Sequence, residues 1–411
     1  MAEMISLARA QGMVAERAGY LDSEEPEVVP LTESLGRRLG RDYHAEGPWP
    51  STDRSAMDGF AVAAGEPGCP AGSTFAVVGE SLAGHPFSGD VADGQAIRIM
   101  TGAVVPSSVD AVVPVEKTSG FEGDTVTLNH DVRCGDNIRP MGSEVADGAL
   151  LLSRGTRIRS AEVGALAVLG QESVPVQRRA RVAILSTGDE VVPVGDDPAP
   201  HQVRDSNSHA LAAQVLEAGG EPVMLGVGRD ERDDLHRLLQ AGLERADILL
   251  TIGGVSKGTH DLVHGLLSEL GVEEVFHGIA LKPGKPTYFG EAPASGSLVF
   301  GLPGNPASCY TVFDLLVRPL IEGRAASASG GLGEPLLAGA SFRSNWRAQA
   351  IPARLEVSSD AGLVARLTEF GPSGNPFGML PADGYAVLPE KVDKDLSRAP
   401  FWTYGGGWSA S

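Results

Sequence analysis

Three glycine-containing turns with polar or charged residues each follow an apolar run in the second half of the chain. They read STGDE (186–190), TIGGVSKGTHD (251–261) and GLPGNP (301–306). Glycine lets backbone amides approach an anion closely, and a helix that follows adds a favourable dipole. Turns after strands also contain glycine for steric reasons alone. A single turn is therefore a weak signal, whereas three turns at one edge of a sheet predict a phosphate-binding site.

Two lysines, Lys282 and Lys285, flank a proline–glycine turn in LKPGKP (281–286). Their ammonium groups are placed to converge on one anion. Two solvated loop lysines are the plainer alternative, and the spacing alone favours it. The chain carries 53 acidic against 33 basic residues, a net charge of −20. In so acidic a protein, two lysines in a rigid loop beside glycine turns are a plausible anion clamp.

Carboxylates fall at or near the ends of the same units, at Glu190, Asp205, Asp230 and Asp261. Carboxylates that gather near phosphates need a compensating positive charge to stay ionised. Mg²⁺ is the usual solution, because it prefers carboxylate, phosphate and water oxygens. The pattern predicts Mg²⁺ as a cofactor.

A second set of polar residues lies in the first half of the chain, in segments that are expected to form loops. They are Asp58 in STDRSAMDGFAV, Thr101 in RIMTGAVVP, and Arg139 and Glu144 in GDNIRPMGSEV. Asp58 and Thr101 offer a carboxylate and a hydroxyl, but composition does not identify the group that they would bind.

Several classes of function are disfavoured by composition. The negative charge opposes binding to nucleic acid. The chain's nine histidines show no H-E-x-x-H spacing. Its three cysteines are odd in number and far apart, which argues against disulfides and thiolate zinc and favours a reducing cytoplasm. No stretch looks like a signal peptide or a membrane helix, so no membrane association is expected.

The elements that must position these residues differ along the chain. Residues 178–325 alternate apolar strands with helices, which predicts a mostly parallel, doubly wound α/β domain whose ligands bind at the carboxyl ends of the strands. Residues 45–175 are short Val- and Ile-rich runs between turns, typical of an all-β region. Residues 3–18 read as an amphipathic helix. The short strands after about 330 indicate a small C-terminal β domain, joined through the stretch RAASASGGLGE.

As a set, nine motifs resemble the signatures of the MoeA family, which includes the C-terminal domain of gephyrin. In chain order they are SAMDGFAV, IMTGA, DAVVPVE, GDNIR, ILSTGDE, DSN, GGVSKG, LKPGKP and GLPGNPAS. The chain has Ile252 and Lys257 where the family commonly has serine and valine. The resemblance implies an elongated dimer of multidomain α/β-plus-β chains. Its domains would be 1–26, an N-terminal helix on the α/β domain; 27–45 with 147–177, domain I; 46–146, the β-rich domain II; 178–326, the molybdopterin-binding domain III; and 327–411, a C-terminal β-barrel.

The resemblance also implies a function, a molybdopterin molybdenumtransferase activity. Its substrates would be adenylylated molybdopterin and molybdate, and metal insertion would accompany Mg²⁺-dependent hydrolysis of the adenylate to AMP. The active site would lie between domain III of one subunit and domain II of the other. A molybdopterin adenylyltransferase is a further expected partner.

Site residues follow from matching these motifs position by position. The catalytic set would be Asp58, Thr101, Glu144, Glu190, Asp230 and Asp261, with Glu190 and Asp261 as metal ligands. The substrate-binding set would be Ser186, Thr187, Gly188, Gly253, Gly254, Ser256, Gly258, Lys282, Lys285, Pro303, Gly304, Asn305 and Pro306.

Two competing hypotheses remain. A molybdopterin adenylyltransferase shares the domain III fold, but it would consist of one such domain without the SAMDG and IMTGA loops. A non-enzymatic scaffold would tolerate replacement of Asp58, Glu190 and Lys285 without loss of cofactor synthesis.

Overall fold

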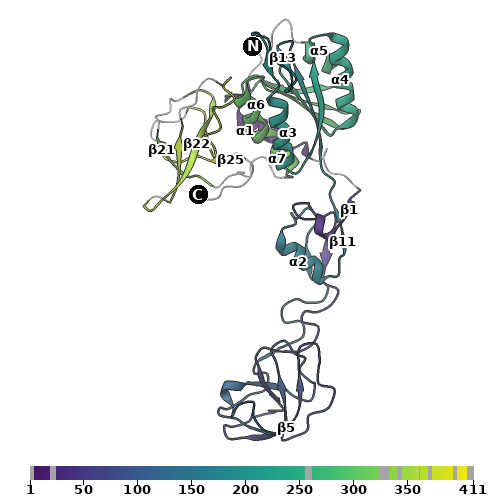
Figure 1. The fold of residues 1–411 in the computed structure, drawn as a ribbon, viewed down its shortest axis with the longest axis vertical. Coiled ribbons are helices and arrows are strands. Elements are labelled where there is room, and N and C mark those ends of the chain that lie inside the picture. The colour runs from purple at the N-terminus through teal and green to yellow at the C-terminus, as the bar shows by residue number, and fades with distance from the viewer. Residues whose placement is uncertain are drawn as a thin grey trace. The chain divides into compact units, whose positions relative to one another are not determined.

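The computed structural model of the chain divides into two compact units (Figure 1). Unit 1 comprises Met1–Glu27 and Gln177–Ser411, and unit 2 comprises Val28–Val176. The structure describes residues 4–18, 25–254, 262–323, 333–339, 345–360, 362–368, 373–391 and 396–404.

A six-stranded sheet forms the centre of unit 1, with the strand order β15-β12-β16-β20-β19-β17. Four strands run parallel: β15 (Glu221–Gly228), β12 (Arg181–Thr187), β16 (Ile248–Ile252) and β20 (Ser297–Leu302). β19 (Tyr288–Ala292) is antiparallel to its two neighbours, β20 and β17 (Glu273–His277). The sheet is therefore mixed. The sequence pattern does not predict β19, because this short strand lies between two turn-rich segments.

Helices cover both faces of this sheet. Successive residues of each strand point to opposite faces, so the strands supply apolar side chains to a core on each side. Val182 and Ile184 of β12 belong to one buried core, and Ala183 and Leu185 belong to the other. Figure 1 shows α4 and α5 together, whereas α1, α3, α6 and α7 gather separately. The first core receives α1 (Leu7–Ala15), α3 (Asn207–Glu217), α6 (Pro306–Val312), the π-helical turn η4 (Phe313–Val317) and α7 (Arg318–Ile321). The second receives α4 (Arg232–Arg245) and α5 (Leu262–Glu269).

The C-terminal strands of unit 1 form a second sheet, in the order β21-β23-β22-β24-β25. Its strands are β21 (Leu336–Gly339), β22 (Ala348–Ser358), β23 (Gly362–Leu367), β24 (Gly384–Leu388) and β25 (Phe401–Thr403). β18 (Leu281–Lys282) also pairs with β22. Backbone bonds from Leu337 to Ser397 and from Phe401 to Gly333 connect the two ends of this order. A closed barrel stays a prediction, and most of the stretch expected to be a domain joint lies outside the described residues.

Unit 2 is rich in β structure and holds three separate apolar cores. Its largest sheet has the order β7-β4-β6-β5-β8, and two of the cores contain residues of these strands. The bounds are β4 (Gly59–Val62), β5 (Thr74–Ser81), β6 (Gln95–Ile99), β7 (Ala111–Pro114) and β8 (Thr125–Thr127). The third core includes Val29, Leu39 and Ile158, from the segments that flank this sheet in sequence.

Short elements complete both units. In unit 2 these are β1 (Glu27–Pro30), which begins at the last residue of unit 1, η2 (Leu31–Glu33), β2 (Tyr43–His44), β3 (Arg54–Ser55), η3 (Val115–Lys117), β9 (Ile138–Arg139), β10 (Leu150–Leu152) and β11 (Ser173–Val176). In unit 1 they are β13 (Val191–Val192) and β14 (Val203–Arg204).

One helix in unit 2 corrects the expectation of an all-β region. α2 (Ser160–Val168) has the sequence SAEVGALAV, with several strong helix formers. The Glu162 carboxylate accepts hydrogen bonds from the backbone N–H of Arg159 at 2.9 Å and from its guanidinium at 2.7 Å. These bonds anchor the first turn of a helix that the apolar composition alone did not distinguish from a strand.

Candidate functional site

The glycine turns of unit 1 lie at one edge of the central sheet. Strand register pairs Ser186 with Ile252, and Ile252 with Leu302. Because these strands are parallel, the turns that follow them emerge at the same edge, here called the carboxyl edge. The substrate-binding residues predicted in these turns are found there: Ser186, Thr187, Gly188, Gly253, Gly254, Pro303, Gly304, Asn305 and Pro306.

Close packing between neighbouring turns explains two of the glycines. Gly253 and Gly254 have φ of +83° and +61°, a region that other residues rarely adopt. A Cβ atom on Gly254 would lie 2.6 Å from Cγ2 of Val263, and one on Gly253 would lie 3.1 Å from the carbonyl oxygen of Thr187. The Thr187 hydroxyl donates to the carbonyl of Ile252 at 3.1 Å. Gly253 thus lets its turn lie close to the backbone of Thr187, and Gly254 leaves room for the side chain of Val263 in α5.

A buried network below these turns involves Asp205. Its carboxylate accepts hydrogen bonds from the hydroxyls of Ser186 at 2.8 Å and Ser208 at 2.5 Å. Asn207 then donates from Nδ2 to the carbonyl of Gly304 at 2.8 Å. Asp205 is only 6% exposed, so its role is to fix the ends of β12 and α3 rather than to face a ligand.

Acidic side chains gather where β12 and β15 end. The backbone N–H of Asp230 donates to Oδ1 of Asp189 at 3.2 Å. Burial raises the pKa of the Asp230 carboxyl, and the negative charges of Asp189 and Glu190 raise it further. The structure therefore brings together two predicted residues, Glu190 and Asp230, and adds Asp189, which the sequence analysis left out although STGDE contains it. These three residues are the acidic cluster.

The lysine loop, residues 278–287, joins the end of β17 to the start of β19. Tyr288 pairs with both His277 and Gly301, which places this loop at the carboxyl edge too. Backbone bonds from Gly278 to Thr287 and from Ile279 to Lys285 hold the loop closed. Lys282 and Lys285 are both exposed, as an anion clamp requires.

Asn305 and Pro306 begin α6. Pro306 lies in the first turn of α6, where a backbone N–H has no acceptor within the helix, so the missing N–H of proline costs no hydrogen bond. The Asn305 side chain makes no capping bond to α6 and donates instead to the Ser373 hydroxyl at 3.2 Å. The turn after β20 is thereby tied to the C-terminal part of unit 1.

The predicted residues of unit 2 form two local pairs. The backbone N–H and the hydroxyl of Thr101 both donate to Oδ1 of Asp58, each at 2.7 Å. These bonds lower the pKa of the exposed Asp58 carboxyl and so favour its ionised form. Arg139 and Glu144 form an exposed ion pair at 3.3 Å. Three other predicted residues, Ser256, Gly258 and Asp261, lie outside the described residues.

No helix among the described residues combines the length and apolar character that crossing a membrane requires. Fold and site together define a multidomain protein whose doubly wound α/β domain presents glycine turns, carboxylates and lysines at the carboxyl edge of its sheet.

Comparison with known proteins gives the family. Residues 5–170 match the model of the MoeA N-terminal region (domain I and II), and residues 183–323 match that of a probable molybdopterin binding domain. A molybdopterin molybdenumtransferase of Bacillus subtilis is 38% identical over 304 residues, which are 72% of this chain and 70% of that protein. One from a Nostoc species is 36% identical over 320 residues, 75% of this chain and 72% of that protein.

A solved structure of a molybdopterin biosynthesis MoeA protein from Pyrococcus horikoshii is similar over 99% of this chain and all of its own. The identity is 31% and the TM-score is 0.81. The chain belongs to the MoeA family. The match to the family's N-terminal region also separates it from an adenylyltransferase made of one α/β domain.

Proposed function

We propose that this chain transfers molybdenum to the dithiolene of adenylylated molybdopterin, with Mg²⁺-dependent hydrolysis of the adenylate and release of AMP. Its role as a transferase of molybdenum cofactor biosynthesis rests on the family and on the names of its relatives. The observation that carries the finer proposal is the placing of the acidic cluster, the glycine turns and the lysine loop at one edge of the sheet.

The acidic cluster has the chemistry that Mg²⁺ needs. Asp189, Glu190 and Asp230 offer carboxylate oxygens, its preferred ligands. The raised pKa of Asp230 reflects burial first and then repulsion from Asp189 and Glu190, and a bound cation offsets both by favouring the charged carboxylate. We therefore assign Glu190 and Asp230 to holding Mg²⁺, with Asp189 beside them. When bound, the ion neutralises phosphate charge. Asp261, which lies outside the described residues, remains a proposed third ligand.

The rest of the edge binds and orients the substrate. The glycine turns let backbone amides reach the pterin and the phosphates without obstruction. The Asp205 network holds the turn after β12, and the Asn207 bond to Gly304 holds the turn after β20. Lys282 and Lys285 bind phosphate or molybdate oxygens. Because the dithiolene sulfurs are the metal's ligands, the protein contributes chiefly position and charge neutralisation.

We propose further that the chain acts in the cytoplasm as a homodimer. Asp58, Thr101 and Glu144 of one protomer would complete the site of a second copy, and a molybdopterin adenylyltransferase would supply the substrate. The ionised Asp58 is suited to a charged or hydrogen-bonding role there. Light scattering must give a dimer, and a mixture of D58A and E190Q proteins must regain part of the activity that each has lost. A monomer with full activity contradicts this arrangement.

Activity is tested by incubating the purified protein with adenylylated molybdopterin, molybdate and Mg²⁺ while AMP release is followed. The proposal predicts AMP release that depends on molybdate and falls in E190Q while the protein stays folded. AMP release no higher than background, with substrate that is shown to be intact, would overturn the proposal. No AMP release by the purified protein, together with unchanged cofactor synthesis in cells that carry D58A, E190Q or K285A, would instead favour a scaffold.

A further inference from the structure

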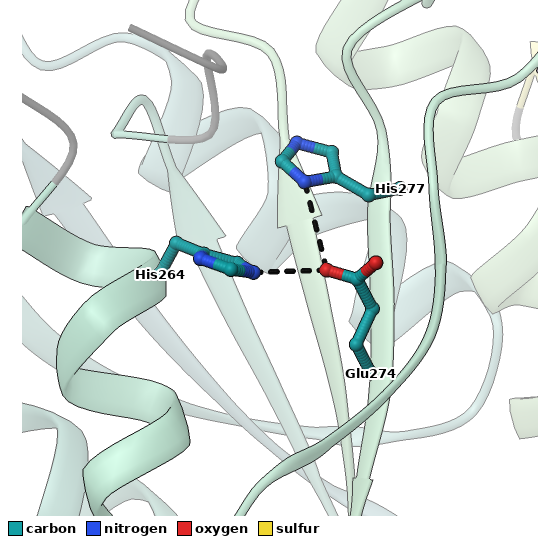
Figure 2. A group of neighbouring side chains, drawn as sticks. All are labelled: His264, Glu274 and His277. Carbon is teal, nitrogen blue, oxygen red and sulfur yellow. Dashed lines mark hydrogen bonds and ion pairs between the residues drawn. The ribbon is translucent and has the colours of Figure 1, made fainter. Parts of the chain in front are cut away.

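Three side chains of unit 1 converge at the outer end of the central sheet. His264 lies in the first turn of α5, and Glu274 and His277 lie in β17, the last strand in the sheet order. Figure 2 shows the helix and the strand directing these side chains toward one another. The function proposed above uses none of the three.

A β-bulge explains how two residues of one strand come to share a face. Residues three apart in a regular strand point to opposite sides. The register shifts between Glu274, which pairs with Gly290, and Phe276, which pairs with Phe289. Val275 is therefore the extra residue, and both it and Phe276 pack on the first core. Glu274 and His277 consequently face the other side, toward α5, as a bulge that re-aims side chains allows.

The distances match a small coordination site. Oε2 of Glu274 lies 2.8 Å from Nε2 of His264 and 3.7 Å from Nδ1 of His277. All three ligand atoms lie within 4.8 Å of one another. Ligands around a tetrahedral ion with bonds of about 2.1 Å are about 3.4 Å apart. The shorter contact, a hydrogen bond in this structure, has to open by about half an ångström to admit an ion.

Exposure and packing also suit metal binding. The His277 side chain is 7% exposed, whereas those of His264 and Glu274 are 43% and 44% exposed. One ligand is thus anchored and two can be reached from water, which leaves room for further ligands. The Tyr288 ring meets both imidazoles edge-on, with centroids 5.5 and 5.7 Å away, and so fixes their planes.

We propose that His264, Glu274 and His277 bind one divalent transition-metal ion of the zinc class, with at least one coordination position open to solvent. Two imidazole nitrogens and a carboxylate favour such ions over Mg²⁺, which prefers oxygen ligands throughout. The site differs in this respect from the acidic cluster. Because His277 ends β17, the ion adds positive charge at the carboxyl edge, just before the lysine loop.

The test measures metal on the full chain, without substrate. Tag-free protein carrying Cys134→Ser, which removes an exposed thiol, is stripped with a chelator and dialysed against Zn²⁺ in excess Mg²⁺. The variants are His264→Gln and Glu274→Gln, at the two more exposed ligands. His201→Gln, an exposed histidine of the same unit, is the matched control. Folding is checked by circular dichroism, and Co²⁺ is added separately to report coordination by its visible spectrum.

The proposal predicts one zinc per chain in the parent and in H201Q, and affinity at least about tenfold weaker in H264Q and E274Q. Zinc must raise the thermal midpoint of the parent more than that of either variant, because binding favours the folded state. Bound Co²⁺ must show the intense bands of a four- or five-coordinate ion. Less than one zinc per parent chain would mean that the cluster is only a hydrogen-bond network. The same conclusion would follow if folded H264Q and E274Q bound zinc as tightly as the parent does. Neither result depends on the proposed transferase activity.

Discussion

The carboxylate of Glu190 lies over Gly188, so close that a Cβ atom on Gly188 would stand 2.6 Å from Oε2. Gly188 also has φ of +127°, which other residues rarely adopt. The turn after β12 thus uses glycine both to bend and to make room for the carboxylate.

Gly188→Ala is expected to displace Glu190 and to strain the turn. We predict weaker Mg²⁺ binding, a fall in AMP release of tenfold or more, and a loss of stability of about 1–3 kcal/mol from the unfavourable φ. Gly195→Ala is the control, since a Cβ there meets nothing within 4 Å. Steady-state kinetics and thermal melting of both variants check this prediction. Full activity in a folded G188A protein would show that the position of Glu190 does not matter.

Asp230→Asn should stabilise the metal-free protein slightly. The pKa of Asp230 is raised in the folded protein, so folding disfavours its charged form. The charged carboxylate therefore lowers the stability of the folded protein, and this loss of stability grows as pH rises through the folded-state pKa. Removing the charge should therefore gain at most about 1 kcal/mol near neutral pH, given its exposure, and less in acid. The measurement is the thermal midpoint against pH.

Mg²⁺ should stabilise the Asp230→Asn variant less than it stabilises the parent protein. Mg²⁺ should raise the thermal midpoint of the parent protein more than those of D230N and E190Q, which lack a proposed ligand. Glu221→Gln, at the amino end of β15, changes an acid at the opposite edge and should respond like the parent. Identical responses from all four proteins would contradict a Mg²⁺ site at the acidic cluster.

Substitution of Lys282 or Lys285 by alanine should weaken substrate binding. Each loses a charge-assisted hydrogen bond worth about 1.5–3 kcal/mol, which corresponds to a rise in KM of about tenfold or more. The rise should shrink at high salt, because exposed charges are screened. Lys117→Ala, in unit 2, serves as the charge-matched control. If KM is the same in K282A, K285A and K117A, the two lysines are the solvated pair that spacing alone suggested.

A buried ion pair in unit 1 gives a test of stability. Arg318 donates from Nε to Oδ1 of Asp314 at 2.7 Å, and both side chains are almost fully buried. Arg318→Met should destabilise unit 1 by about 3–5 kcal/mol, because it leaves the buried Asp314 carboxylate without a counter-charge. Burial already raises the pKa of Asp314 to about 6 despite Arg318. The deficit should therefore be smaller at pH 5, where the protonated acid is uncharged, than at pH 8.

Urea unfolding at both pH values measures this deficit. Arg366→Met breaks an exposed pair with Glu356 in the C-terminal sheet and should change stability by less than about 1 kcal/mol. Equal effects of R318M and R366M would contradict the expected penalty for an unpaired buried charge.

Much of the α/β domain could be predicted from sequence, because its strands are continuous apolar runs that end in glycine turns. RVAILST became β12 and ILLTI became β16. The lysine loop could be placed near the other turns only once β19 was known, since this antiparallel strand begins at the carboxyl edge, directly after the loop. β19 itself is a short apolar run between turns, which resembles a loop with buried residues.

The individual site residues were harder to predict than the edge that carries them. Asp205 and Glu190 are both acids near strand ends, but only the structure shows that Asp205 is buried in hydrogen bonds. The convergence of His264, Glu274 and His277 depends on a bulge at Val275, which leaves no sequence pattern. Asp58 and Thr101 are far apart in sequence, and only the fold shows that they bond to each other.

The central claim is that the carboxyl edge of the α/β sheet binds the pterin nucleotide. Hydrogen–deuterium exchange with and without adenylylated molybdopterin, in Mg²⁺ but without molybdate, measures this directly. We expect the substrate to slow exchange in residues 186–190, 278–287 and 302–306 and to leave the amino ends of the same strands unchanged. Bound substrate that protects none of these three segments would contradict the claim.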